Sequence, residues 1–295
     1  MEEVIQCKNL THYYGAKLVF ENMNFTVKRG SIFGLLGKNG TGKTTTINIL
    51  NGFLQPTGGE CLIFGENTQA LSPPTKAKIG FLMEGHIQYS FMNIFQIEKF
   101  YSAFYPDWKK EPYYELMKKL EISQKQKISK MSCGQRSQVA LGLILAQDPE
   151  LMILDDYSMG LDPGYRQLFI DYLSEYDKAE RKTIFVTSHI IQDMERLIDD
   201  MVVLDYRSIL LSMSPKKFMD SFKQYRFEFR NSPPELHKDE IIKNFDIIKN
   251  HATVYTFAAR AEIENYLRSK QIQFVDLQEI PMSLESAFIG LTGKY

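Results

Sequence analysis

The distribution of apolar and polar residues predicts two kinds of element along the chain. Short, wholly apolar runs bounded by turn residues recur, as at residues 151–154, and a strand buried on both faces has this composition. Between about residues 90 and 150 the period of the apolar residues changes to that of a helix. Tyr113, Leu116 and Met117 have the spacing of an amphipathic helix. The predicted strands are residues 4–7, 25–27, 31–36, 61–65, 79–83, 151–154, 183–187, 201–204 and 225–229.

This alternation of buried strands and helices indicates an α/β fold with a mainly parallel sheet. We expect residues 1–217 to form the α/β domain, with the segment of about 88–150 as a helical subdomain that Pro106 and Pro112 divide into separate helices. Residues 218–295 are predicted to form a small α+β C-terminal domain, in which we find no motif with chemical meaning.

Composition narrows the class of protein. With 44% hydrophobic residues in 295, the chain has enough apolar surface for a substantial core. The 35 Lys and Arg balance 36 Asp and Glu, so no basic field favours a nucleic-acid partner. Cys7, Cys61 and Cys133 are odd in number and far apart, which fits neither a disulfide framework nor a zinc site and suits a reducing cytosol. Without a long apolar span or a basic, apolar leader, we expect neither secretion nor a membrane span.

Residues 37–44 carry the strongest motif, a complete GxxxxGK[ST] between a predicted strand and a predicted helix. Glycines let successive backbone N–H groups converge on a phosphate chain at a helix N-terminus. We expect Lys43 to reach the β- and γ-phosphates and the Thr44 hydroxyl to hold Mg²⁺; the alternative is a chance match. The predicted nucleotide contacts are Gly37, Lys38, Asn39, Gly40, Thr41, Gly42, Lys43, Thr44 and Thr45.

Two acidic residues follow the apolar strand at 151–154. At the carboxyl end of a strand beside the P-loop strand, Asp155 could hold Mg²⁺ through water, and Asp156 could polarise the attacking water. Tyr14 is a candidate platform on which a nucleotide base stacks, or else an ordinary strand-end tyrosine.

The order of these motifs resembles the ATP-binding subunits of ABC transporters over roughly residues 1–215. Tyr14 matches the adenine-stacking loop of that family, residues 132–135 its signature, residues 159–162 its D-loop and His189 its switch histidine. The resemblance implies a P-loop NTPase core with an antiparallel β subdomain and an inserted helical subdomain, followed by the α+β extension. Residues 282–288 and 104–108 are similar to segments of small bacterial exporters of the ABC-2 type.

The resemblance also implies a mechanism. ATP and Mg²⁺ would be the cofactors, with Asp156 and His189 catalytic. A second ATPase subunit, either another copy or a related chain, would close the site with its own signature and D-loop residues. An integral-membrane permease would dock near Glu84 and residues 85–110, which puts this chain at the cytoplasmic face of the membrane. The signature and D-loop residues expected to meet the nucleotide are Ser132, Gly134, Gln135 and Asp162.

Three positions depart from the family pattern. Cys133 replaces a signature glycine, Glu84 replaces the Q-loop glutamine as a Mg²⁺ contact, and Asp156 replaces the catalytic glutamate. The shorter carboxylate predicts slow hydrolysis, because general-base catalysis depends on reach. Two alternatives stay open: a catalytically weak, regulatory nucleotide-binding subunit, and a soluble ABC ATPase without a transport role.

Overall fold

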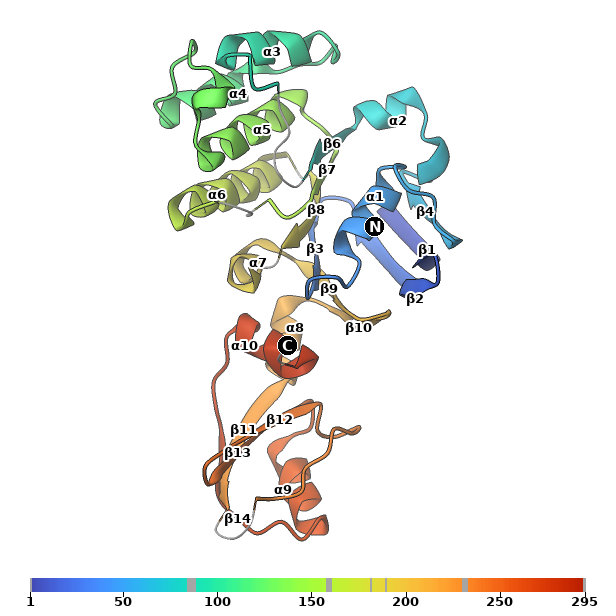
Figure 1. The fold of residues 1–295 in the computed structure, drawn as a ribbon, viewed down its shortest axis with the longest axis vertical. Helices are drawn as coiled ribbons and strands as arrows, with labels where there is room; N and C mark the ends of the chain where they lie inside the picture. The colour runs from blue at the N-terminus through green and yellow to red at the C-terminus, as the bar shows by residue number, and fades with distance from the viewer. Residues whose placement is uncertain are drawn as a thin grey trace. The chain divides into compact units, whose positions relative to one another are not determined.

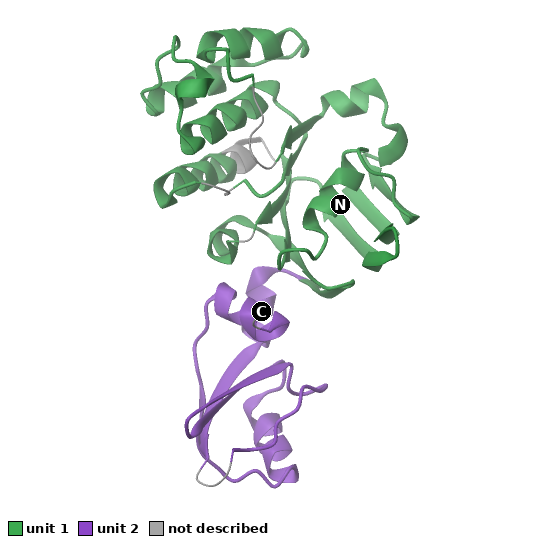
Figure 2. Cartoon of the chain, viewed as in Figure 1, with its two compact units in different colours: residues 1–212 green, residues 213–295 purple. Residues whose placement is uncertain are grey.

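The computed structural model describes residues 2–83, 89–157, 161–180, 182–188, 190–229 and 233–293, with the side chains of 176–180 left out. Two compact units make up the chain, residues 1–212 and 213–295 (Figure 2). The sequence predicts the boundary at 217/218. The α/β composition of the first unit confirms the predicted fold class.

Unit 1 is built on a six-stranded sheet with the strand order β10-β9-β3-β8-β7-β6. Strands β9, β3, β8, β7 and β6 pair in parallel, so their carboxyl ends meet at one edge. Strands β3, β7 and β8 are buried at every residue, which explains the apolar runs that mark them in the sequence. The strands are β3 (Ile32–Gly37), β6 (Ile79–Leu82), β7 (Leu151–Leu154), β8 (Thr183–Ser188), β9 (Asp200–Asp205) and β10 (Ser208–Met213).

A second, antiparallel sheet of unit 1 has the order β2-β1-β4-β5. Its first two strands are 12 residues each, longer than the short runs predicted at residues 4–7 and 25–27. The apolar side chains along both strands are separated by outward polar ones. Only short parts of each strand are therefore recognisable in the sequence as apolar runs. The strands are β1 (Glu3–Tyr14), β2 (Lys17–Lys28), β4 (Gly58–Ile63) and β5 (Glu66–Asn67).

Helices cover both faces of the parallel sheet. Figure 1 shows α5, α6 and α7 on one side, and α1 with the antiparallel sheet on the other. The helices of unit 1 are α1 (Lys43–Leu50), η1 (Thr68–Ala70), α2 (Pro73–Ala77), α3 (Ile94–Ser102), α4 (Lys110–Lys119), η2 (Ile128–Lys130), α5 (Cys133–Gln147), α6 (Pro163–Glu180) and α7 (Ile191–Leu197).

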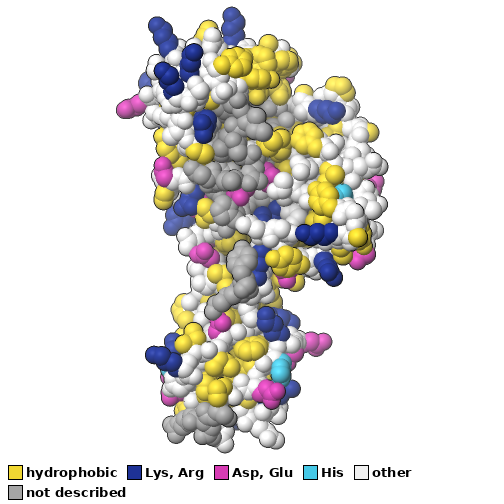
Figure 3. Space-filling view, viewed as in Figure 1, with side chains coloured by type: hydrophobic (Ala, Val, Ile, Leu, Met, Phe, Trp, Pro, Cys, Tyr) yellow, Lys and Arg dark blue, Asp and Glu magenta, His cyan; other side chains and the backbone are white. Residues whose placement is uncertain are grey.

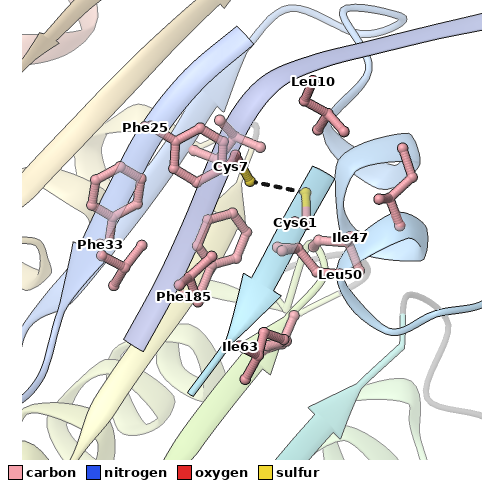
Figure 4. Packing of buried hydrophobic residues seen from close by; sticks show 14 of the residues in the cluster. Cys7, Leu10, Phe25, Phe33, Ile47, Leu50, Cys61, Ile63 and Phe185 are labelled. Atoms are coloured by element: carbon pink, nitrogen blue, oxygen red, sulfur yellow. Dashed lines mark hydrogen bonds between the residues drawn. The ribbon is translucent and has the colours of Figure 1, made fainter. Parts of the chain in front are cut away.

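The main core of unit 1 lies between the two sheets and α1 (Figure 4). Phe33 stacks on Phe25 and Phe185, with ring centroids 5.6 and 5.9 Å apart, and so joins strands of both sheets. Cys7 and Cys61 face each other across β1 and β4 with their sulfurs 3.2 Å apart. Far apart in sequence, they form a buried pair of thiols that sequence spacing did not predict.

The helical part of unit 1 consists of α3, α4 and α5. Tyr113 and Leu116 are fully buried, as the helical period predicts. On α3 and just after it, Phe95 is 50% and Phe104 65% exposed. Figure 3 shows hydrophobic side chains gathered over this end of unit 1.

Unit 2 has its own sheet, in the order β12-β13-β11-β14, and its own core. Tyr225 and Phe227 of β11 are buried together with Ile263 and Leu267 of α9. The elements are α8 (Pro215–Ser221), β11 (Lys223–Phe229), β12 (Asn244–Ile248), β13 (His251–Thr256), α9 (Arg260–Ser269), β14 (Phe274–Glu279) and α10 (Leu284–Thr292).

Among the described residues of both units, no helix combines the length and the apolar character that crossing a membrane requires.

Candidate functional site: a nucleotide pocket

A pocket of about 1260 Å³ opens at the carboxyl edge of the parallel sheet. Loops at the carboxyl ends of parallel strands are the usual ligand site of such sheets. Residues that the sequence analysis selected from three separate segments share its wall. They are Tyr14, Asn39, Gly40, Gly42, Lys43, Thr44, Thr45, Asp155 and Asp156.

The P-loop turns back on itself between β3 and α1. The Lys43 ammonium donates to the backbone carbonyls of Gly37 and Lys38 at 2.7 and 3.0 Å. The hydroxyl of Thr41 also donates to the Lys38 carbonyl, at 2.8 Å. These bonds hold the loop in a tight curve, with the lysine side chain lying along its inner side.

Gly42 caps the start of α1 with φ at +101°, a backbone conformation that L-residues avoid. A Cβ there would lie 2.7 Å from the Phe20 ring and 2.8 Å from Val19. Strand β2 therefore packs directly against the loop. This gives a second reason for glycine at position 42, because the close approach of β2 leaves no room for a side chain.

Asp155 follows β7 and is 3% exposed. Its Oδ1 accepts a hydrogen bond from Thr187 at 2.9 Å and lies 3.5 Å from the hydroxyl of Thr44. The sequence predicts that β7 lies beside the P-loop strand, but this is wrong: β8 lies between β3 and β7. Thr187 therefore lies on the strand between β3 and β7, where it contacts Asp155. The sequence motifs assign Thr187 no role.

Asp156 has a positive φ of 41°. Its backbone N–H donates to the Thr187 hydroxyl at 2.9 Å, so one threonine holds both consecutive acids. Both acids line the pocket, with the Thr44 hydroxyl on the same wall.

Tyr14 ends β1 and is 51% exposed. Its hydroxyl lies 3.4 Å from the Thr45 hydroxyl, and its ring meets His12 edge-on with centroids 4.8 Å apart. Burial lowers the pKa of His12, which keeps this supporting ring neutral at pH 7. A large part of the Tyr14 ring is thus exposed at the pocket while its position is restrained.

The signature residues begin α5. Ser132 and Gln135 form a reciprocal capping box, each side chain accepting from the backbone N–H of the other at 3.1 Å. A Cβ on Gly134 would meet the Tyr165 ring at 2.6 Å, so glycine is needed where α6 packs. Cys133 lies within the helix without a positive φ, a conformation that suits a residue with a Cβ.

Other predicted contacts lie apart from the pocket or outside the described residues. Asp162 accepts from the backbone N–H of Tyr165 at 3.0 Å, at the start of α6. Within the described part of the chain, Ser132, Gly134, Gln135 and Asp162 do not line the pocket. Glu84, residues 159–160 and His189 lie outside the described residues. Of the P-loop residues, Gly37, Lys38 and Thr41 form the loop behind the pocket wall.

The pocket also has a wall that no motif predicted. Lys17 is the first residue of β2, directly after the β1–β2 turn, and Tyr206 and Arg207 come from the turn between β9 and β10. Their types and spacing carry no recognisable signal in the sequence, because each turn is brought to the P-loop by strand pairing.

A strand, a glycine loop closed by Lys43, and a carboxylate beside the hydroxyl of Thr44 together define a P-loop nucleotide-binding protein. The ABC transporter family model matches residues 20–158. The bacitracin transport ATP-binding protein BcrA of Bacillus licheniformis is 30% identical over 249 residues, which cover 84% of this chain and 81% of BcrA. The chain belongs to the ABC transporter ATP-binding proteins.

A second relative and a solved structure are also similar to this chain. The Nod factor export ATP-binding protein I of Burkholderia orbicola is 30% identical over 300 residues, 98% of this chain and 97% of the relative. The fold matches the dimeric ATP-binding cassette MJ0796 in a post-hydrolysis state with ADP and Pi, at a TM-score of 0.62 and 22% identity. That match covers 71% of this chain and 98% of the cassette, and supports the P-loop NTPase fold.

Proposed function

We propose that the chain is the ATP-binding and ATP-hydrolysing subunit of a membrane exporter, working as a dimer on the cytoplasmic face of the membrane. One observation carries the proposal: the P-loop, the two acids after β7 and Tyr14 meet in a single pocket. The export role draws on relatives named for bacitracin transport and Nod factor export.

The residues present fit Mg²⁺ and a triphosphate. Mg²⁺ prefers oxygen ligands, and the Thr44 hydroxyl and the Asp155 carboxylate lie 3.5 Å apart on the pocket wall. When bound, Mg²⁺ neutralises negative charge on the β- and γ-phosphate oxygens. Lys43 and the N–H groups at the start of α1 would bind the phosphates, with Tyr14 against the base. Thr187 acts as a positioning residue, since it orients Asp155 and the backbone of Asp156.

Hydrolysis needs a base near the γ-phosphate, and Asp156 is the candidate. Its carboxylate is one methylene shorter than the glutamate of the family pattern, so the water it polarises is held less closely. We therefore expect slow but measurable turnover. His189 and Glu84 are proposed to assist at the same phosphate.

A second copy would complete the site. Ser132 and Gly134 begin a helix whose first N–H groups suit an anion, but they do not line the pocket among the described residues. A two-fold pairing of chains would bring the α5 end of one copy to the P-loop of the other. MJ0796, which shares the fold, is dimeric.

The proposed permease contact is the helical part of unit 1. Exposed aromatic side chains lie there, including Phe91 at 67% and Phe104 at 65%. A groove of about 320 Å³ between β6 and α5 is lined by Phe81, Met83 and Tyr101 among others. An apolar helix of a membrane partner suits such a surface.

The test compares the wild type with Asp156→Asn and Asp156→Glu. We expect Asp156→Asn to bind ATP, to lose turnover by about 10²–10⁴-fold, and to accumulate as an ATP-bound dimer in size-exclusion chromatography with light scattering. Asp156→Glu should hydrolyse ATP faster than the wild type.

Different outcomes separate the alternatives. Zero turnover in both the wild type and Asp156→Glu would indicate a regulatory nucleotide-binding subunit. An Asp156→Asn variant that stays monomeric with ATP contradicts the shared site. Co-purification with an integral-membrane protein separates an exporter subunit from a soluble ABC ATPase.

A further inference from the structure

The turn between β9 and β10 contributes Tyr206 and Arg207 to the wall of the nucleotide pocket. Tyr206 is 58% exposed, and Arg207 is exposed beside it. Across the residues that the structure describes, neither the tyrosine hydroxyl nor the guanidinium has a hydrogen bond or an ion pair. A large aromatic ring and a flat cation thus line the pocket without a hydrogen-bond or ion-pair partner among the described residues.

The turn is held in place by its backbone. Strand β9 pairs in parallel with β3, with Leu204 beside Gly37, so the chain leaves β9 next to the P-loop. The Arg207 carbonyl accepts a hydrogen bond from the N–H of Glu21 at 2.9 Å, and Arg207 forms an isolated bridge with Phe20. These contacts tie the turn to β2, the strand that packs on Gly42.

Arg207 also has a φ of +86°, which is uncommon for a residue with a side chain. A glycine would adopt this conformation at lower cost. An arginine kept in a strained turn at the rim of a pocket suggests that the side chain itself has a use there.

The wall formed by this turn is separate from the phosphate-binding elements. Lys43 and the N-terminus of α1 are the proposed phosphate contacts. The pocket, at about 1260 Å³, is larger than the volume that a triphosphate alone occupies. Tyr14 and Lys17 pair at the end of the β1–β2 hairpin and form one part of the pocket rim. The β9–β10 turn forms another part of the rim. Aromatic rings and guanidinium planes both stack on nucleotide bases.

We propose that Tyr206 and Arg207 form a second nucleoside-contacting element, which packs against the base held by Tyr14. The inference rests on the proposed ATP-binding function and deepens it. Since every base has a π-face, the element raises affinity for nucleotides without choosing among purines.

The experiment measures the binding of Mg·ATP and of inorganic tripolyphosphate by isothermal titration calorimetry. Tyr206→Ala should weaken ATP binding roughly 5- to 100-fold while tripolyphosphate affinity changes less than about twofold. Arg207→Gly, which preserves the left-handed backbone, should give a smaller loss with the same selectivity. Leu210→Ala is the matched control, because it removes an exposed apolar side chain of the same hairpin outside the pocket wall.

Four results overturn the inference. Unchanged ATP affinity in both variants means that the turn makes no contact, and an equal loss for ATP and tripolyphosphate means that it acts through the phosphates. If wild-type protein binds tripolyphosphate but not ATP, the nucleoside contact fails while the phosphate site stands. Wild-type protein that binds neither ligand contradicts the proposed function itself, and this inference with it.

Discussion

Gly40 and Gly42 of the P-loop share a left-handed backbone but differ in their surroundings. Their φ values are +80° and +101°, so a side chain at either position is strained. Among the residues that the structure describes, a Cβ on Gly40 meets nothing within 4 Å, whereas one on Gly42 would collide with Val19 and Phe20. Backbone strain and close packing can therefore be separated experimentally within one loop.

We predict that Gly42→Ala destabilises the protein by about 2–4 kcal/mol, since overpacking adds to the backbone strain. Gly40→Ala, the matched control, should cost about 1–2 kcal/mol from backbone strain alone. Thermal unfolding and ATP titration measure both effects, and we expect ATP binding to be lost in Gly42→Ala and weakened in Gly40→Ala. Equal unfolding temperatures for the two variants would contradict the packing argument.

At the scale of elements, helix α5 begins with a capping box on the residues of the family signature. Ser132 satisfies the N–H of Gln135 within its own chain. The same side chain is proposed to reach a nucleotide bound by a second copy. Helix α10 of unit 2 begins in the same way, with Ser283 accepting from the N–H of Ser286 at 3.2 Å.

These two caps allow a matched comparison. Ser132→Ala and Ser283→Ala should each lower stability by about 1 kcal/mol, because each leaves one helix N–H without its cap. Only Ser132→Ala is expected to weaken ATP-dependent dimerisation of the Asp156→Asn protein, as measured by light scattering. If both variants dimerise alike, Ser132 serves only as a cap.

At the scale of the whole molecule, the two units have separate cores. Unit 2 packs β11 and β13 against α9 through buried residues of its own, among them Phe227, Val254 and Leu267. A four-stranded sheet covered by a helix exceeds the minimum that is stable alone.

We expect residues 213–295, produced alone, to unfold in one cooperative thermal transition followed by circular dichroism. Phe227→Ala should lower the stability of this fragment by about 3–5 kcal/mol, because it opens a cavity in a small core. A fragment without a cooperative transition would show that unit 2 depends on unit 1.

The sequence alone predicted the α/β class, the P-loop and the acids after β7, because each of these is local. A glycine loop, a lysine and a threonine within eight consecutive residues favour a phosphate-binding turn, and a short, wholly apolar run favours a strand buried on both faces. The family resemblance followed from the order of such local motifs.

Only the tertiary structure decided how distant segments meet. It put β8 between β3 and β7, which made Thr187 the link between the acids and the P-loop wall. It also paired Cys7 with Cys61 and brought Tyr206 into the pocket. Strand order and pairing register depend on the packing of the whole sheet, so no spacing along the chain encodes them in readable form.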